Sequence, residues 1–451
     1  MINSLIFFAS ILQYGSPFLQ ISSVILTCMC LLFTMFKDNK FDMIKSLIIA
    51  IILFDDISYD IESVNTTIHT VTLLGFSLSE IFVLSSFIKF NLISSKNFFL
   101  DTLKPFIAIL VIGLIFPLFD LNIGYDRYLM KIIVLVLLSS MFFKFFIENK
   151  KDQELLKFLL YAISIKAFLN ICLLLFGVGS EIADGAYLRG NAATTKNLMH
   201  IPIVFYISSL LFKIPNKNFF LFAIFSTVAL FSYSSRAQLV LTFFIILVII
   251  LRYGFMTLNI KSIFYSISFF LLMIFSIYLT FNFLAPGMGQ FTFWKLSTTF
   301  TADLTEFGSA QNRIFEIINI YDTLTSNNAL LFGLGWGSFF TDSFYPFINY
   351  YWGKSAYPLE VFESGKIYYP HGIFIILFLK TGLIGLVFYF KFALNIFIRG
   401  INSFSNPYLV IVSFSILPLL YKFNSFINIF ILSILIALFS FYNQSLTKHE
   451  Q

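Results

Sequence analysis

The sequence predicts an all-α polytopic integral membrane protein with about 13 (12–14) transmembrane helices and one long, partly helical segment on the outer side. Three observations predict this fold class. Charged residues make up 12% of the 451-residue chain, against about 25% in soluble domains. The mean hydropathy is +0.89, and apolar runs recur along the whole chain. Lysines gather in alternate loops, which is typical of cytoplasmic loops.

Runs of about 20 apolar residues, the length that crosses a bilayer core, define the expected spans. These spans are 18–36, 41–55, 70–90, 104–120, 127–147, 154–177, 197–212, 219–233, 237–251, 262–285, 371–391, 407–421 and 425–443. The apolar stretch 1–13 lacks a positively charged start and a small-residue cleavage pattern, so it could be a short first span or a re-entrant piece. All of 1–451 is expected to form one transmembrane domain.

The basic residues of alternate loops assign one face of the membrane to the cytoplasm. They are Lys37, Lys40, Lys45, Lys89, Lys96, Lys104, Lys144, Lys150, Lys151, Lys213, Lys217, Arg252, Lys261, Lys391 and Arg399. Six other lysines fall at or near the outer side, so the sorting is a bias. Because the excess of lysine has this topological role, the net charge of +6 requires no nucleic-acid partner.

The segment 285–370 is the only stretch between spans that is large enough to fold outside the membrane. Within it, 311–324 has apolar residues at spacings of three and four, which predicts an amphipathic helix. Gly333, Gly335 and Gly337 follow it and permit a tight backbone path close to another group. The sequence has no evident internal repeat, so a repeat-built transporter is not supported.

The six arginines are distributed differently from the lysines, because four of them fall on the outer side. These four are Arg127, Arg189, Arg236 and Arg313. A guanidinium group suits bidentate capture of phosphate or carboxylate, so the distribution predicts an anionic group handled at the outer face. The alternative for each arginine is contact with lipid headgroups or pairing with a nearby acid.

Two of these arginines stand in positions that are costly for a cation. Arg236 lies between two short spans, in a turn expected to dip toward the membrane, where a charge needs a partner or water. Arg313 opens the amphipathic helix, where a cation opposes the helix dipole. It is therefore expected to be held by an external anion or acid.

His371 is the second candidate for chemistry. It follows Pro370 where the outer segment meets a span, so we expect it in the first helical turn, as a base that is neutral near neutral pH. The alternative is an ordinary interfacial histidine. Gly382 and Gly385 follow on the same helix and would let another helix approach. Lys380 falls mid-span and is expected to pair with an acid such as Glu80 or to reach toward the inner surface.

These strings resemble the O-antigen polymerase and O-antigen ligase family of bacterial surface-polysaccharide enzymes. The family motif is His, an amide or hydroxyl residue, nine variable positions, Gly, two positions, and a small residue or Tyr. Here Gly372 stands at the second position, and Lys380 stands where family members often carry an acid. The matching strings, in family order between 187 and 385, are Arg189-Gly190 with Lys196-Asn197, Ser235-Arg236, Arg313 to Glu316 with Leu331 to Gly337, and His371 with Gly382 and Gly385.

The resemblance implies a metal-independent membrane glycosyltransferase, without a cofactor, in the bacterial inner membrane with its active site facing the periplasm. Its substrates would be polyprenyl-diphosphate-linked oligosaccharides as donor and acceptor, and a chain-length regulator and a flippase would be its protein partners. Arg189, Arg236 and Arg313 would bind diphosphate or acidic sugars, and His371 would activate the acceptor hydroxyl or orient the phosphate. Supporting substrate contacts would come from Asn191, Glu316, Arg127 and the segment containing Gly333, Gly335 and Gly337.

The expected function is therefore polymerisation of O-antigen or related repeat units. A ligase that transfers finished polymer to lipid A–core shares the motif and differs only in its acceptor. A lipid-linked-oligosaccharide flippase would instead place ionisable groups such as Lys166, Lys380 and Glu80 along a path through the bilayer. A structural scaffold is the remaining alternative, and it predicts that changes at Arg313 and His371 are silent.

Overall fold

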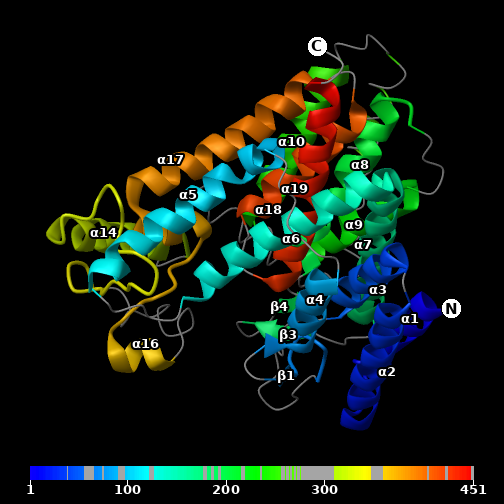
Figure 1. The fold of residues 1–451 in the computed structure, drawn as a ribbon, viewed down its shortest axis with the longest axis horizontal. Helices are drawn as coiled ribbons and strands as arrows, with labels where there is room; N and C mark the ends of the chain where they lie inside the picture. Colours follow the sequence, from blue (N-terminus) through cyan, green and yellow to red (C-terminus); the bar gives the residue numbers. More distant parts are fainter. Residues whose placement is uncertain are drawn as a thin grey trace.

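The computed structural model describes most of the chain. The described residues are 1–37, 39–54, 66–73, 76–89, 97–120, 126–175, 180–183, 187–190, 195–214, 219–233, 236–254, 309–346, 359–403, 406–421, 425–447 and single positions between 260 and 275. The described part is mainly helical, with α14 and α16 at one end of the molecule and α1 and α2 at the other (Figure 1).

Helices form most of the described elements. They are α1 (Ile2–Leu12), α2 (Pro17–Phe36), α3 (Lys40–Leu53), α4 (Leu78–Lys89), α5 (Asn97–Asp120), α6 (Arg127–Asn149), α7 (Asp152–Leu175), α8 (His200–Leu211), α9 (Phe219–Tyr233), α10 (Arg236–Ile249), α14 (Ser309–Ser326), α16 (Leu359–Ser364), α17 (Ile373–Asn402), α18 (Pro407–Tyr421) and α19 (Phe426–Thr447). A 3-10 helix, η1 (Thr195–Leu198), precedes α8, and a π-helix, η2 (Ile250–Gly254), ends α10. Two antiparallel hairpins pair β1 (Thr72–Leu73) with β2 (Phe76–Ser77) and β3 (Ser180–Ala183) with β4 (Tyr187–Gly190).

Five helical stretches within the described residues are long and apolar enough to cross a membrane. They are Pro17–Phe36, Tyr128–Asn149, Asp152–Cys172, Ile373–Asn402 and Phe426–Ser445. The chain is therefore a helical membrane protein, and the described structure does not establish a count of about 13 spans. The expected span 262–285 lies outside the described residues except for single positions.

Local sequence signals explain where several helices begin. The Asn39 side chain accepts hydrogen bonds from the first turn of α3, and Asp126 does the same for α6. Ser77 and Glu80 form a capping box at α4, with Ser77 N–H donating to Glu80 Oε2 (2.8 Å) and Glu80 N–H to Ser77 Oγ (3.2 Å). The expected span 70–90 is therefore wrong in its first part, because a hairpin occupies Thr72–Ser77 and the helix starts at Leu78.

The core lies along α18 and α19, which other helices surround. Helix α6 packs on α19, α17 packs on α18 and α5, and α8 joins α9 to α18. In its most apolar window α19 is 89% buried, whereas α2 is 39% buried and exposes large apolar side chains such as Phe18 and Phe36. Helix α2 thus has the exposed apolar surface expected of a helix that faces lipid.

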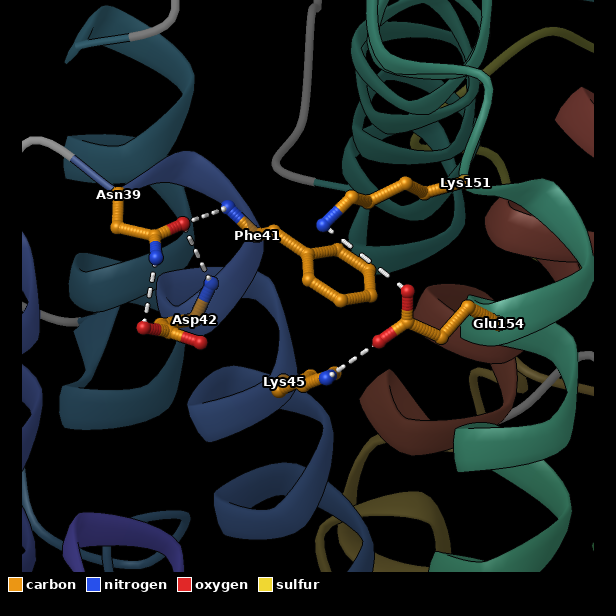
Figure 2. A network of polar contacts seen from close by, with 6 residues as sticks. All are labelled: Asn39, Phe41, Asp42, Lys45, Lys151 and Glu154. Atoms are coloured by element: carbon orange, nitrogen blue, oxygen red, sulfur yellow. Dashed lines mark hydrogen bonds and ion pairs between the residues drawn. The ribbon is translucent and has the colours of Figure 1, made fainter.

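One polar cluster ties α3, α6 and α7 together at a single end of these helices. Glu154 on α7 pairs with Lys45 (2.9 Å) and Lys151 (4.0 Å), and both lysine Nζ atoms lie near the centroid of the Phe41 ring, at 4.0 and 4.3 Å. Figure 2 shows this ring between the two ammonium groups. Beside it Glu148 pairs with Lys40 (3.5 Å) and Lys144 (3.9 Å). Lysines that the sequence assigns to the cytoplasmic face thus meet in one place.

Helix α17 contains a break that positions the candidate site. Gly382 has φ +62° and ψ −159°, which is not helical. The segment 330–335 fills the break: Leu334 and Gly335 N–H donate to Leu379 and Lys380 O (both 2.9 Å), and Leu383 and Ile384 N–H donate to Leu330 (3.0 Å) and Leu331 O (3.1 Å). Backbone groups that the break removes from the helix are thereby satisfied, as an apolar interior requires.

Candidate functional site

His371 and Glu316 form the central pair of the site. The imidazole Nδ1 lies 2.8 Å from Glu316 Oε1, and the backbone N–H of His371 donates to both carboxylate oxygens, at 2.9 and 3.1 Å. The Glu316 side chain is 0% exposed, whereas that of His371 is 37% exposed. A buried carboxylate therefore holds an imidazole that solvent can reach.

Helix α14 presents Glu316 from its buried face. Ile320 and Leu324 recur on this face and pack with Phe340, Ile367 and Leu379 in a small core of their own. One turn beyond Glu316, the Asn319 side chain bonds to both the N–H and the C=O of Tyr345 (2.9 Å each). These contacts fix the rotation of α14 and so the place of the carboxylate.

The glycine segment follows α14 and passes close to α17. Gly333, Gly335 and Gly337 all have positive φ, at 73°, 83° and 87°. A Cβ built on Gly333 would lie 2.4 Å from the backbone of Lys380 and Thr381, so only glycine fits there. Trp336, between these glycines, is buried and donates from its backbone to Gly113 O (2.7 Å) and from Nε1 to Leu110 O (3.1 Å) on α5.

An ion pair that the sequence did not predict lies beside this segment. Lys380 Nζ is 2.9 Å from Asp126 Oδ2, and the two side chains are 0% and 1% exposed. The same carboxylate oxygen accepts from Gly337 N–H (3.0 Å), Oδ1 caps α6, and Lys380 also donates to Ser338 O. Buried charges are tolerated when they are paired and hydrogen-bonded in this way. The pair joins α6, α17 and the glycine segment.

The structure thus brings together some of the predicted site residues. Glu316, Gly333 and Gly335 contact the first part of α17 or the residues just ahead of it, and Gly337 donates to Asp126, the partner of Lys380. Among the described side chains, His371 and Glu316 are the one pair of predicted site residues joined by a hydrogen bond. Glu316 was predicted as a substrate contact, and its observed partner is His371.

The arginines are placed only in part. Arg313 is half-buried on α14, one turn ahead of Glu316. Arg127 is the first residue of α6, and Arg236 is the first residue of α10. Arg189 on β4 lies opposite Glu181 on β3 in the backbone register. The side chains of these three arginines are not among those described. Asn191 lies outside the described residues. Whether these arginines converge on the His371 pair stays a prediction.

Lys380 pairs with an acid, as expected, but the acid is Asp126, whereas the Glu80 carboxylate accepts from its own capping box. Three other expectations about this region are wrong. His371 is not in the first turn of α17, because the helix begins at Ile373 behind Gly372, and the helix continues beyond 391 to Asn402. Gly382 admits the backbone of Leu331 and Gly333, so it meets a loop and not another helix.

Part of this geometry had a signal in the sequence. Asp126 directly before an apolar run is a helix-capping signal. Its second role, as the partner of Lys380, depends on two segments about 250 residues apart and on a break in α17 that hydropathy does not reveal.

The fold and this site define a class: a helical membrane protein with a His–Glu pair at the start of a long apolar helix. Comparison with known proteins adds nothing to this class, since no protein-family model, no curated protein and no solved structure matches the chain.

Proposed function

We propose that this protein is a repeat-unit polymerase for O-antigen or a related surface polysaccharide. It transfers the growing glycan from a polyprenyl-diphosphate carrier to a lipid-linked repeat unit at the periplasmic face of the inner membrane. The observation that carries the proposal is the contact between a fully buried Glu316 and a solvent-accessible His371, at 2.8 Å. The resemblance of the motif strings to the polymerase and ligase family supplies the substrate class.

In the proposed reaction His371 takes the proton of an acceptor hydroxyl. With Nδ1–H donating to the Glu316 carboxylate, Nε2 is the nitrogen with the lone pair. The acceptor oxygen bonds to the anomeric carbon of the donor as its proton passes to Nε2. The bond from that carbon to the diphosphate oxygen breaks, and its electron pair leaves with the lipid diphosphate. Glu316 stabilises the imidazolium that results.

The leaving group needs positive charge where its own charge develops. We assign this task to Arg313, on the same helix as Glu316, and to Arg189 and Arg236. Guanidinium donors can stabilise a departing diphosphate without a metal ion. Replacement of Arg313 by Lys would retain the charge and lose the planar fork, so it should restore activity only in part.

Two alternatives differ in what accumulates when the protein is absent. A ligase would use the same donor chemistry with lipid A–core as acceptor. A flippase would need ionisable groups along a central path, but the buried Lys166 bonds to Tyr14 OH and Leu53 O, and the buried Lys380 pairs with Asp126. Both lysines therefore contribute to the packing of the protein interior.

The test is the surface-polysaccharide profile of a deletion strain, complemented with wild type, Arg313→Ala or His371→Ala. Core bearing a single repeat unit in the deletion strain supports a polymerase, and failure of both variants to restore long chains supports the proposed roles. Bare core with long lipid-linked polymer would indicate a ligase instead. Bare core with repeat units on the cytoplasmic side would overturn the proposal in favour of a flippase.

Arg399→Ala is the matched control for the loss of an arginine. Arg399 is exposed near the end of α17, remote in sequence from the His371 pair, and should support normal chain length. Protein levels are compared by immunoblot in every strain. Normal-length polymer from an Arg313→Ala/His371→Ala double variant would exclude the mechanism.

A further inference from the structure

A row of four aromatic rings extends from the His371 segment. Tyr369 lies 5.7 Å from Tyr128 and 6.4 Å from Tyr368, and Tyr368 lies 5.4 Å from Phe339, measured between ring centroids. These distances are within the range of direct aromatic contact. The rings come from α6, from just after the glycine segment and from just ahead of α17, so the row depends on the tertiary fold.

A short antiparallel bridge sets the Phe339 and Tyr368 rings. Phe340 N–H donates to Ile367 O (3.1 Å) and Ile367 N–H to Phe340 O (2.9 Å). This register puts Phe339 opposite Tyr368 as a cross-strand pair. Phe340 and Ile367 are buried in the small core beside α14, and because side chains alternate along paired strands, Phe339 and Tyr368 point to the other face.

The two central tyrosines of the row remain open to solvent. Tyr368 is 37% exposed and Tyr369 is 38% exposed, although each contacts two other rings. Tyr369 precedes His371 by two residues, so at most about 7 Å of backbone separates them. Two partly exposed phenol rings thus lie within three residues of His371 in the chain.

Ring faces and sugar rings are chemically complementary. An aromatic face carries negative potential, and the C–H groups on one side of a pyranose carry partial positive charge, so the two surfaces stack. The two outer rings make cation–π contacts with lysines: Lys366 Nζ is 4.7 Å from the Phe339 centroid, and Lys131 Nζ is 4.6 Å from the Tyr128 centroid. The tyrosine hydroxyls add hydrogen-bonding groups that a bare apolar surface would lack.

We propose that Tyr368 and Tyr369 form an acceptor subsite, in which a pyranose ring of the incoming repeat unit stacks beside His371. The substrate class rests on the proposed function, while the location rests on the aromatic row. The row is continuous and includes Tyr369, two residues ahead of His371, whereas interfacial anchoring needs only separate aromatic residues around the helices. The acceptor hydroxyl would be presented to Nε2 by this stacking, which lowers the KM for the acceptor.

Kinetics on the full chain in liposomes test the subsite. The acceptor is the lipid-linked repeat unit extracted from the deletion strain. Tyr368→Ala and Tyr369→Ala should each raise the KM for the acceptor about tenfold with a smaller change in kcat. Tyr368→Phe and Tyr369→Phe keep the ring and should stay within about twofold of wild type. Tyr321→Ala, an exposed tyrosine on α14 outside the row, is the matched control and should leave KM unchanged.

A binding measurement separates the subsite from catalysis. Soluble repeat-unit glycan, released from its lipid by mild acid, is titrated into His371→Ala protein with and without the additional substitution Tyr369→Leu. Leucine keeps apolar bulk at this position, so the variant can be used even if the Ala variants fail to accumulate. Loss of glycan binding in the Leu variant supports the subsite. Unchanged KM and unchanged glycan binding, while His371→Ala abolishes polymerisation, would overturn the subsite and leave the proposed function intact. Normal polymerisation by His371→Ala would refute the mechanism, whatever the tyrosines do.

Discussion

At the residue scale, the buried Glu316 carboxylate and the partly exposed His371 imidazole have different proposed roles. Glu316 has no access to solvent, and its oxygens accept three hydrogen bonds from the backbone and the ring of His371. Burial of a carboxylate is costly unless such donors compensate. In the proposed mechanism Glu316 is a positioning residue that acts through His371, in the way that a carboxylate orients the histidine base of other enzymes.

Glu316→Gln should separate positioning from stability. The glutamine carbonyl can still accept from the His371 backbone, but its NH2 group would face Nδ1 as a donor and favour the tautomer whose Nε2 carries the proton. We expect kcat to fall by about 100-fold or more, because a positioned base contributes about 10²–10⁴-fold. The KM for the acceptor and the thermal midpoint should change little.

The matched control is Glu363→Gln on α16, an exposed glutamate. It should retain wild-type kcat. A fall of kcat and thermal midpoint together in Glu316→Gln would mean that the pair is structural, and wild-type kcat would remove Glu316 from the mechanism.

At single residues the sequence singled out His371 and the three glycines as candidates by residue type and spacing, and Glu316 by the resemblance of its string. It could not identify their partners. The His371–Glu316 contact joins residues 55 positions apart, and the Lys380–Asp126 contact joins residues about 250 apart. Such pairs are fixed by packing, which periodicity along one helix does not encode.

At the scale of elements, α17 is the unusual helix because a loop completes it. The filled break at Gly382 separates the first part of α17, which packs on α14, from the later part, where Tyr389 and Phe392 contact Phe106 of α5. Hydropathy predicted most of the described helices near their observed positions, and α9 and α18 match the expected ranges 219–233 and 407–421. Apolar composition predicts that a segment is buried, but it does not predict the backbone angles within that segment. The sequence therefore did not predict the break at Gly382.

Gly382→Ala tests whether the loop and the helix must touch. A Cβ there would lie 2.5 Å from Gly333 N and from Leu331 C, and the residue would also keep the strain of φ +62°. Gly365→Ala is the matched control, because Gly365 has φ +66° with no atom within 4 Å of an added Cβ. The control should cost about 1–2 kcal/mol for strain alone, and Gly382→Ala should cost several kcal/mol more. Thermal midpoints in detergent measure both, and equal shifts would show that the loop can move aside.

At the scale of the whole molecule, α6 connects two polar regions of different kinds. Asp126, the partner of Lys380, lies at its start, and Glu148, the partner of Lys40 and Lys144, lies at its end. The 23 residues of α6 separate these regions by about 34 Å, close to the thickness of a bilayer core. Under the proposed topology the lysine-rich end is the cytoplasmic one, and the His371 end faces the periplasm.

Cysteine labelling tests this orientation. The native Cys28, Cys30 and Cys172 are first replaced, and single cysteines are introduced at Glu363 and at Lys150. Because both native side chains lie at least partly in solvent, each cysteine should be reachable from its own side. A membrane-impermeant maleimide should label Glu363→Cys in spheroplasts and label Lys150→Cys only after permeabilisation. The reverse pattern would place the His371 pair in the cytoplasm.

The filled break in α17 has a consequence for the order in which the protein is made. Leu331 to Gly335 are synthesised before residues 379–384, so the backbone groups that complete the break already exist when the broken helix leaves the ribosome. If α17 entered lipid first, these N–H and C=O groups would be unsatisfied at several kcal/mol each. We therefore expect α17 to enter the membrane together with residues 331–335, which complete its hydrogen bonds. A circular permutant that places 331–335 after α17 should be inserted less efficiently.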